Sequence, residues 1–488
     1  MLFVLVLVAA LCAWAAWSTR AARARPTPPA LAGWRPLVGH GHLLLDNDGL
    51  KMYRSVVKMS EECTEKGGLV TFYLGLKKVY GITDPDDCVT VMNTCLEKSL
   101  VIKFMKQFLG NGLFTADVDR WQISRKLMNP LFNQKVLDGF IDIFNSQAEK
   151  LVDAFSSEIG KPFDHEKILR KNNWETICCT AFETDNNTVS DILKEYLPLL
   201  AIGTNKMNKR MQNFWLHSDF IYNMTALKRE VDEIANKLIA LSKMMIQKFL
   251  SDKPQEPNRK INMTSGVRGP AQPFMEMLVE HARGGRLTAR QLREEADTLL
   301  LAGHETTAAA LAFTFTLLGS HPRAQARLHR EVVEVCGESE RRIEKQDLSK
   351  LVYTEAVLKE ALRLYPIGVL LPRRARSAVS LKNYTIEADS ECIVLAHGLH
   401  RHAAWGADAG VFRPERWLEG ASEPRHYAAF GLGRRACIGK AYALMSMKTS
   451  VAHVVRRYRV SSDAARMVVA LQVTSRPASG HFIAVRPR

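Results

Sequence analysis

The chain contains the segment Phe430-Gly431-Leu432-Gly433-Arg434-Arg435-Ala436-Cys437-Ile438-Gly439, which is followed by the helix-forming run Lys440-Ala441-Tyr442-Ala443-Leu444-Met445. This order predicts a glycine-permitted loop at a helix N-terminus, where free backbone N–H groups and the positive end of the helix dipole favour a thiolate. Such a thiolate can be the axial ligand of a haem iron. The alternative interpretation is a buried, inert cysteine beside a helix end.

Composition narrows the classes of protein that fit. The 488 residues are 47% hydrophobic and 24% charged, so the chain can bury a large core. Its nine cysteines show neither C-x-x-C pairs nor zinc-ligand spacing, which predicts reduced thiols facing the cytosol. The net charge of +16 is spread along the chain without interleaved stacking aromatics. It therefore favours an anionic membrane surface or an acidic protein partner, and no nucleic acid.

The N-terminus predicts a membrane anchor. Residues 1–17 are uncharged and almost wholly apolar, and Arg20, Arg23 and Arg25 follow at once. A cleaved secretory signal is the alternative, because the run is short for a spanning helix. Positive charge after the apolar run favours a retained anchor with the rest of the chain in the cytosol. We expect an anchor over residues 1–19, a basic, proline-rich hinge over 20–36 and a folded domain over 37–488.

The sequence of the folded domain predicts a mainly α fold with small β-sheets. Short β-type runs occupy residues 69–74 and 78–82, and the pattern beyond Asp84-Pro85 is largely helical. Strand signals return around residues 378–395 and near the C-terminus.

Three further patterns place polar side chains on predicted helices. The run Ala302-Gly303-His304-Glu305-Thr306-Thr307 sits in a long apolar helix, and its glycine and threonines mark a point where backbone bonding can open. Glu360 and Arg363 can form a bidentate pair on one helix face, and Trp121 and Arg125 share another. Each pattern alone has a structural alternative. The first also fits a kinked structural helix, the second a surface ion pair, and the third a half-buried tryptophan beside a surface arginine.

Taken in order, the motifs resemble those of the cytochrome P-450 superfamily over essentially the whole chain beyond the anchor. The matching motifs are F-x-x-G-x-R-x-C-x-G at 430–439, A-G-x-[DE]-T-T at 302–307, E-x-x-R at 360–363, a block similar to P-E-R-F at 412–417, and W-x-x-x-R at 121–125. Residues 210–222 and 442–448 look like the animal microsomal branch related to fatty-acid ω-hydroxylases, particularly its insect members.

The resemblance implies a cytochrome P-450 fold, with haem b between a long distal helix and the proximal cysteine loop. The residues it assigns to haem binding are Cys437 as the iron ligand, Phe430, Gly303, Trp121, Arg125, Arg435 and either Arg373 or Arg374. By the same resemblance, Thr306 and Glu305 deliver protons, and Glu360, Arg363 and Arg416 lock the cysteine loop. Many ω-hydroxylases attach their haem through a glutamate at the position of Ala302, so non-covalent haem is expected here.

The implied activity is a haem-thiolate monooxygenase that inserts one atom of O₂ into a lipophilic substrate, such as a fatty acid, terpenoid, hormone or xenobiotic. No G-x-G-x-x-G follows a predicted strand, so electrons would come from NADPH-cytochrome P-450 reductase, with cytochrome b5 as a further candidate, at the endoplasmic reticulum membrane. Arg434, Lys440 and Lys448 are candidate contacts for that partner, or ordinary surface charges. Two alternatives stay open: a haem-thiolate isomerase or dehydratase that needs no reductase, and a non-catalytic haem-binding protein.

Overall fold

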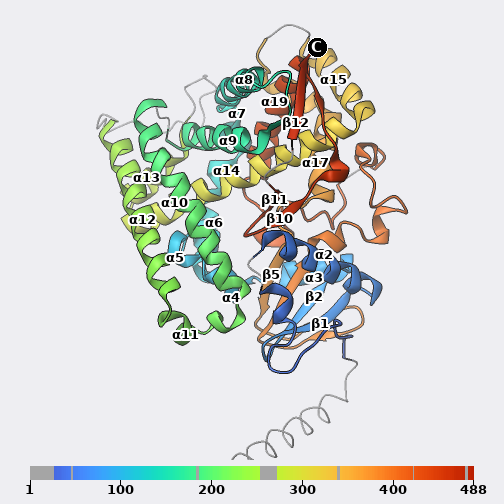
Figure 1. The fold of residues 1–488 in the computed structure, drawn as a ribbon. Helices are drawn as coiled ribbons and strands as arrows, with labels where there is room; N and C mark the ends of the chain where they lie inside the picture. Colours follow the sequence, from blue (N-terminus) through green and yellow to red (C-terminus); the bar gives the residue numbers. More distant parts are fainter. Residues whose placement is uncertain are drawn as a thin grey trace, which may run out of the picture.

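The structure is a computed structural model, and it describes residues 27–45, 48–182, 186–252, 272–337, 341–420, 423–478 and 482–488 (Figure 1). The anchor expected over residues 1–19 and the first part of the expected hinge lie outside these ranges. Within them, no helix has both the length and the apolar composition that crossing a membrane requires.

Helices form most of the molecule. The longer ones are α2 Gly49–Glu65, α3 Pro85–Thr94, α6 Val118–Met128, α8 Ile141–Ser156, α9 His165–Phe182, α10 Asn186–Gln212, α12 Ala226–Asp252, α13 Phe274–Arg283, α14 Ala289–Ser320, α15 Pro322–Cys336, α17 Val352–Leu364 and α19 Lys440–Arg457. Short helices include α4 Leu100–Lys103, α5 Lys106–Leu109, α7 Gln134–Asp138, α11 Asp219–Asn223, α16 Lys345–Lys350 and α18 Ala396–Leu399. The expected mainly α fold with small sheets is confirmed.

The longest helix, α14, runs through the middle of the molecule (Figure 1). It begins at a capping box, in which the Thr288 hydroxyl accepts from the Gln291 N–H and the Gln291 side chain accepts from the Thr288 N–H. Its C-terminal half is buried from Thr307 to Leu318. Helix α9 packs along it, and His165 Nε2 lies 3.1 Å from the carbonyl oxygen of Ala312.

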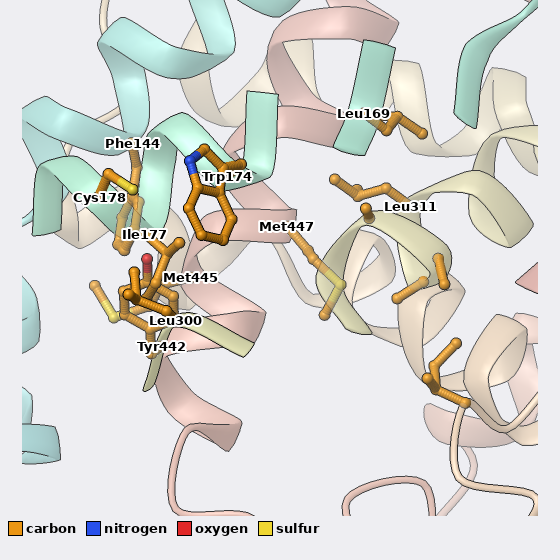
Figure 2. Packing of buried hydrophobic residues seen from close by; sticks show 14 of the residues in the cluster. Phe144, Leu169, Trp174, Ile177, Cys178, Leu300, Leu311, Tyr442, Met445 and Met447 are labelled. Atoms are coloured by element: carbon orange, nitrogen blue, oxygen red, sulfur yellow. The ribbon is translucent and has the colours of Figure 1, made fainter. Parts of the chain in front are cut away.

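Helices α8, α9, α14 and α19 contribute to one large hydrophobic core. Figure 2 shows part of this core, with Trp174 from α9, Leu300 from α14 and Tyr442 from α19. The buried Tyr442 hydroxyl lies 3.0 Å from the Thr180 hydroxyl, so its polar end is satisfied inside the core. This packing fixes the helix that follows Cys437 against the central helices.

The main sheet lies at one end of the molecule and has the strand order β1-β2-β8-β5-β3. Its strands are β1 Leu69–Leu74, β2 Lys77–Ile82, β8 Ser390–Leu395, β5 Leu370–Ala375 and β3 Glu97–Lys98. Strands β2 and β8 are parallel, and the other neighbours are antiparallel. The remaining strands form smaller sheets: β4 Phe163–Asp164, β12 Phe482–Pro487 and β9 Tyr458–Ser461; β10 Val469–Leu471 and β11 Ser475–Pro477; β6 Val379–Ser380 and β7 Thr385–Ile386.

Two sequence expectations change at this sheet. The strand region expected from residue 378 begins eight residues earlier at Leu370, since the apolar start of β5 pairs with β8. The end of the expected hinge also packs onto the sheet, because the Leu31 N–H donates to the Thr71 carbonyl and the Thr71 N–H donates to Pro29. Residues 29–31 are therefore part of the folded domain.

Candidate functional site

The loop that carries Cys437 is tightly fixed by its backbone. A short 3₁₀ helix, η7 (Gly433–Arg435), precedes the cysteine, and the Cys437 N–H donates to the Phe430 carbonyl at 2.7 Å. Gly433 has φ +66°, and a Cβ there would lie 2.6 Å from the Met92 carbonyl oxygen, so only glycine fits. The Cys437 residue itself is exposed, so it borders open space ahead of α19.

The thiol of Cys437 is not predisposed to ionise by the loop alone. Protein packed around the sulfur raises the pKa of the Cys437 thiol, while the Gly439 N–H and the charges of Arg125 and Lys440 lower it, and the net shift is upward. A coordinated metal ion is a positive partner that deprotonates a thiol outright.

A second surface that borders open space lies on α14. Ala302 is exposed and Thr306 partly so, although most of their neighbours on this central helix are buried. The Thr306 hydroxyl donates to the Ala302 carbonyl at 2.7 Å, and the Thr307 hydroxyl to Gly303 at 3.0 Å. The expected opening of the helix is absent, because α14 is continuous from residue 289 to 320.

Gly303 has a packing reason that the sequence did not reveal. A Cβ at Gly303 would lie 2.7 Å from Ile177 Cδ1 on α9. The missing side chain thus allows α9 and α14 to approach closely.

Glu305 belongs to a row of alternating charges. Its Oε1 atom lies 3.4 Å from Nη2 of Arg170 on α9. Arg170 Nε lies 3.8 Å from Glu166 Oε1, which in turn is 4.0 Å from Arg476 Nη1. Burial raises the pKa of Glu166. The row connects the α14 acid with the partly exposed Arg476, and no sequence motif marked Arg170.

Three buried cations, Lys98, Arg373 and Arg435, lie close together at the main sheet. Lys98 and Arg373 are paired residues of β3 and β5, so their side chains point to the same face of the sheet. Burial, and then repulsion from Arg373 and Arg435, hold the pKa of Lys98 well below its usual value. Burial lowers the pKa of Arg373 and that of Arg435 to about 10.

The polar atoms of this cationic cluster are only partly satisfied. Arg373 Nη1 donates to the Pro372 carbonyl at 2.9 Å, and Arg435 Nη2 to the Ala116 carbonyl at 3.0 Å. In the part of the chain that the structure describes, Arg373 Nε, Arg435 Nε and Arg435 Nη1 are buried without a hydrogen-bond partner. Burying an unpaired cation costs free energy, so anionic groups would stabilise this cluster. The two propionates of a haem meet that need, and the residues fit this cofactor.

Strand geometry places the side chains of Arg373 and Arg374 on opposite faces of the main sheet. Successive side chains of a strand point to opposite faces. Arg373 is buried with Lys98, whereas Arg374 is exposed and pairs with Asp389 at 3.1 Å. Only Arg373 belongs to the cationic cluster.

Helix α6 connects the cationic cluster with the cysteine loop. Trp121 is buried, and the Arg435 guanidinium lies 4.5 Å from its ring centroid. Arg125, one turn later, donates from Nη1 to the Ala436 carbonyl at 2.8 Å. The two residues thus hold different parts of the site, the first through Arg435 and the second through the residue before Cys437.

Glu360 and Arg363 on α17 are both fully buried and form a bidentate pair, with both N–O distances at 2.9 Å. Arg416, from the 3₁₀ helix η6 (Pro414–Trp417), donates from Nε to Glu360 at 2.9 Å. Burial raises the pKa of Glu360, but the hydrogen bond and charge of Arg363 and the hydrogen bond from Arg416 lower it by more, so the net shift is downward. The carboxylate is therefore compensated inside the protein.

A chain of hydrogen bonds leads from this cluster toward the cysteine loop. Arg363 donates from Nη1 to the carbonyls of His400 and Ala409, each at 2.6 Å. His400 Nδ1 lies 2.9 Å from the Arg363 carbonyl, and its Nε2 accepts from the Ala428 N–H at 2.9 Å. Burial lowers the pKa of His400 to about 3, so the neutral ring can make both bonds. Ala428 lies two residues before Phe430.

One expected partner contact is wrong. Lys448 is buried and pairs with Glu355 at 3.0 Å, so it offers no charge to a docking protein. Lys440 is half-buried and pairs with Glu423 at 2.6 Å, while Arg434 is exposed. Lys98 is the opposite case: no motif marked it, and only the pairing of β3 with β5 brings it to the site.

Comparisons with known proteins agree with this geometry. The family model described as Cytochrome P450 matches residues 28–477. The chain is similar to human "Cytochrome P450 4V2", with 28% identity covering 95% of this chain and 90% of the relative. It is 30% identical to Drosophila melanogaster "Probable cytochrome P450 313b1", covering 88% of each chain. It is 26% identical to Drosophila melanogaster "Cytochrome P450 4c3", covering 95% of this chain and 89% of that protein. The animal and insect resemblance is confirmed.

Proposed function

The chain belongs to the cytochrome P450 family and is a P450 monooxygenase, and we propose that it hydroxylates or epoxidises a lipophilic substrate with electrons from NADPH-cytochrome P-450 reductase. One observation supports a haem-dependent activity most directly. The buried Arg373 and Arg435 leave three nitrogen atoms unpaired beside α6, the helix that also holds the cysteine loop. Cytochrome b5 is a second candidate electron donor.

We propose that haem b is held non-covalently. Cys437 would be the axial ligand, and Lys98, Arg373 and Arg435 would pair with the propionates. Ala302 offers no carboxylate for an ester bond. When bound, a thiolate-ligated haem supplies the oxygen activation that the protein side chains lack. Glu360, Arg363 and Arg416 would act only through the position of the loop.

The side chains of α14 would supply protons. The Thr306 hydroxyl is partly exposed and donates to the Ala302 carbonyl. A rotation about χ1 would turn its proton toward the open side of α14. Glu305 Oε1 is held by Arg170 at 3.4 Å, a long contact that can break. Arg170 would orient the carboxylate of Glu305, and Glu305 would receive protons from solvent and pass them to Thr306.

A reconstituted oxidation tests the proposal. Full-length protein, NADPH-cytochrome P-450 reductase and NADPH are combined under ¹⁸O₂ with a panel of fatty acids, terpenoids and lipophilic toxins. We expect a product that carries one ¹⁸O atom and depends on NADPH and reductase. Turnover without reductase would favour the isomerase or dehydratase alternative, and tight ligand binding without any turnover would favour a non-catalytic haem protein.

Removing the α14 acid should uncouple electron use from product. Glu305→Gln is expected to lower product formed per NADPH by at least about 10-fold, since positioned acids contribute about 10²–10⁴-fold in typical enzymes. Arg170→Gln should have a smaller effect of the same sign, because it removes the partner that orients Glu305. Lys171→Gln is the control, because Lys171 follows Arg170 on α9 and is exposed. Equal coupling in Glu305→Gln and Lys171→Gln would refute the proton-delivery role.

An exposed apolar surface supports the proposal that the folded domain contacts the endoplasmic reticulum membrane. It comprises Trp34, Leu37, Leu76, Trp215, Phe220, Ile221 and Met224. Leu76 is 87% exposed at the turn between β1 and β2, and Phe220 is 75% exposed on α11. Phe214 packs on both Gly41 and Gly75, which joins these segments into one face, and Figure 1 places α11 and β1 at the same end. Such a surface, with tryptophans, suits a membrane interface.

Fluorescence quenching tests this orientation. Full-length protein is placed in vesicles that contain brominated phospholipid, which quenches the fluorescence of nearby tryptophans. The quenched fraction should be measurably smaller in Trp215→Phe than in the wild type, because Trp215 would lie at the lipid surface. Trp417→Phe is the matched control, since Trp417 donates to the buried Glu360. Identical quenching in the two variants would place the membrane surface elsewhere.

A further inference from the structure

A small cavity lies at the end of strand β5. Its volume is about 160 Å³, which leaves room for a group of several non-hydrogen atoms. Its lining includes Glu97, Arg374, Arg376 and Ser377. Glu97 and Arg374 are paired residues of β3 and β5, so they belong to the same face of the main sheet. The cavity therefore brings two guanidinium groups and a serine to one space.

Ser377 lies where another protein can reach it. It is exposed in the bend between β5 and β6, together with its neighbours Arg376 and Ala378. Within the part of the chain that the structure describes, the Ser377 hydroxyl makes no hydrogen bond. Its oxygen is therefore free to react without breaking a contact that holds the fold.

The residues before Ser377 supply exposed positive charge. Arg374 lies three residues before the serine and Arg376 one residue before it, and their side chains are 44% and 70% exposed. Arg373, four residues before the serine, is buried on the opposite face of the sheet. Arginines at these positions before a serine are a charge pattern by which basophilic protein kinases select their substrates. The structure thus leaves two of the three arginines exposed to such a kinase.

We propose that Ser377 is a phosphorylation site for a basophilic protein kinase, and that Arg374 and Arg376 hold the phosphate at the cavity. Ser377 Oγ attacks the γ-phosphorus of ATP, and a new O–P bond forms. The bond from that phosphorus to the bridging oxygen of the β-phosphate breaks, ADP leaves, and the hydroxyl proton passes to the base of the kinase. In the cell, this modification rests on the proposed cytosolic position of the folded domain, which a test on purified protein does not require.

The present partners of both arginines can be exchanged at low cost. Arg374 pairs with Asp389 at 3.1 Å, but the Asp389 side chain is 71% exposed, and such surface pairs contribute little stability. Arg376 Nη2 lies 3.2 Å from Glu97 Oε2, while Lys103 Nζ lies 2.6 Å from Glu97 Oε1. The buried Glu97 therefore keeps a cation when Arg376 turns to the phosphate. A phosphate group accepts stronger, charge-assisted hydrogen bonds from the two guanidinium groups.

Phosphopeptide mapping tests the site in the full-length, haem-loaded protein. The protein is incubated with ATP and the catalytic subunit of cAMP-dependent protein kinase, and its digest is analysed by mass spectrometry. We expect phosphate on Ser377 and several-fold slower incorporation in Arg374→Ala. Ser380→Ala is the matched control, because Ser380 is exposed on β6 but has no arginine three residues before it, so this variant should incorporate phosphate as the wild type does. An unmodified Ser377, or equal labelling of Ser380, would overturn the proposal.

A pH titration followed by phosphorus NMR tests whether the arginines hold the phosphate. The second pKa of a solvated phosphoserine is about 6. Nearby guanidinium groups favour the dianion, so this pKa should be lower in the phosphorylated wild type than in the same protein unfolded in urea. In phosphorylated Arg376→Ala it should rise toward the unfolded value. The same pKa in folded and unfolded wild type would show a phosphate in solvent and would overturn the role of Arg374 and Arg376 in holding it.

Discussion

Replacing Cys437 by alanine is expected to abolish the red-shifted Soret band of the reduced, carbon monoxide-treated protein, with no residual thiolate signal. The loop should survive the change, because Cys437 is exposed and the loop is held by the bond from its N–H to the Phe430 carbonyl. The loss would therefore reflect the missing ligand, not a misfolded domain.

The control for this experiment is Cys179→Ala, which removes another thiol that is only partly buried. It should retain the band, and both variants should keep the far-ultraviolet circular dichroism of the wild type. A red-shifted band in Cys437→Ala would contradict the assignment of the axial ligand and, with it, the proposed mechanism.

Arg363→Ala should give almost no folded, haem-loaded protein. The change leaves Glu360 as a buried carboxylate with one fewer guanidinium, and it also frees the carbonyls of His400 and Ala409. Breaking a buried pair typically costs about 3–5 kcal/mol, a large share of a domain's stability of about 5–15 kcal/mol. The measurements are the yield of haem-loaded protein and the urea midpoint of whatever folds.

Two matched variants separate this effect from a general loss of charge. Arg374→Ala removes an exposed arginine of β5 and should leave yield and urea midpoint near those of the wild type. Arg363→Lys keeps the charge but not the bidentate geometry, so its stability should fall between the other two. Wild-type yield and haem content in Arg363→Ala would show that the cluster does not hold the loop.

Local sequence was sufficient for the helical class and for the ligand loop. Glycines at positions 431 and 433, which adopt φ +74° and +66°, already required a turn before Cys437, and the run after Gly439 forms α19 as predicted. The spacing of Glu360 and Arg363 placed them on one face of a helix, where they form the bidentate pair. These features depend on neighbours within a few residues, and a short segment of sequence contains that information.

Contacts between distant segments could not be predicted in this way. Strand pairing brings Lys98 to Arg373 across 275 residues, and the alternation of β5 turns Arg373 inward and Arg374 outward. The approach of α9 to α14 explains Gly303 and pairs Arg170 with Glu305. Burial of Lys448 against Glu355 removed an expected docking charge. Local sequence thus specifies the chemical groups of this protein and the turns that carry them. Folding specifies which charges meet, because burial and pairing depend on segments that are far apart in the chain.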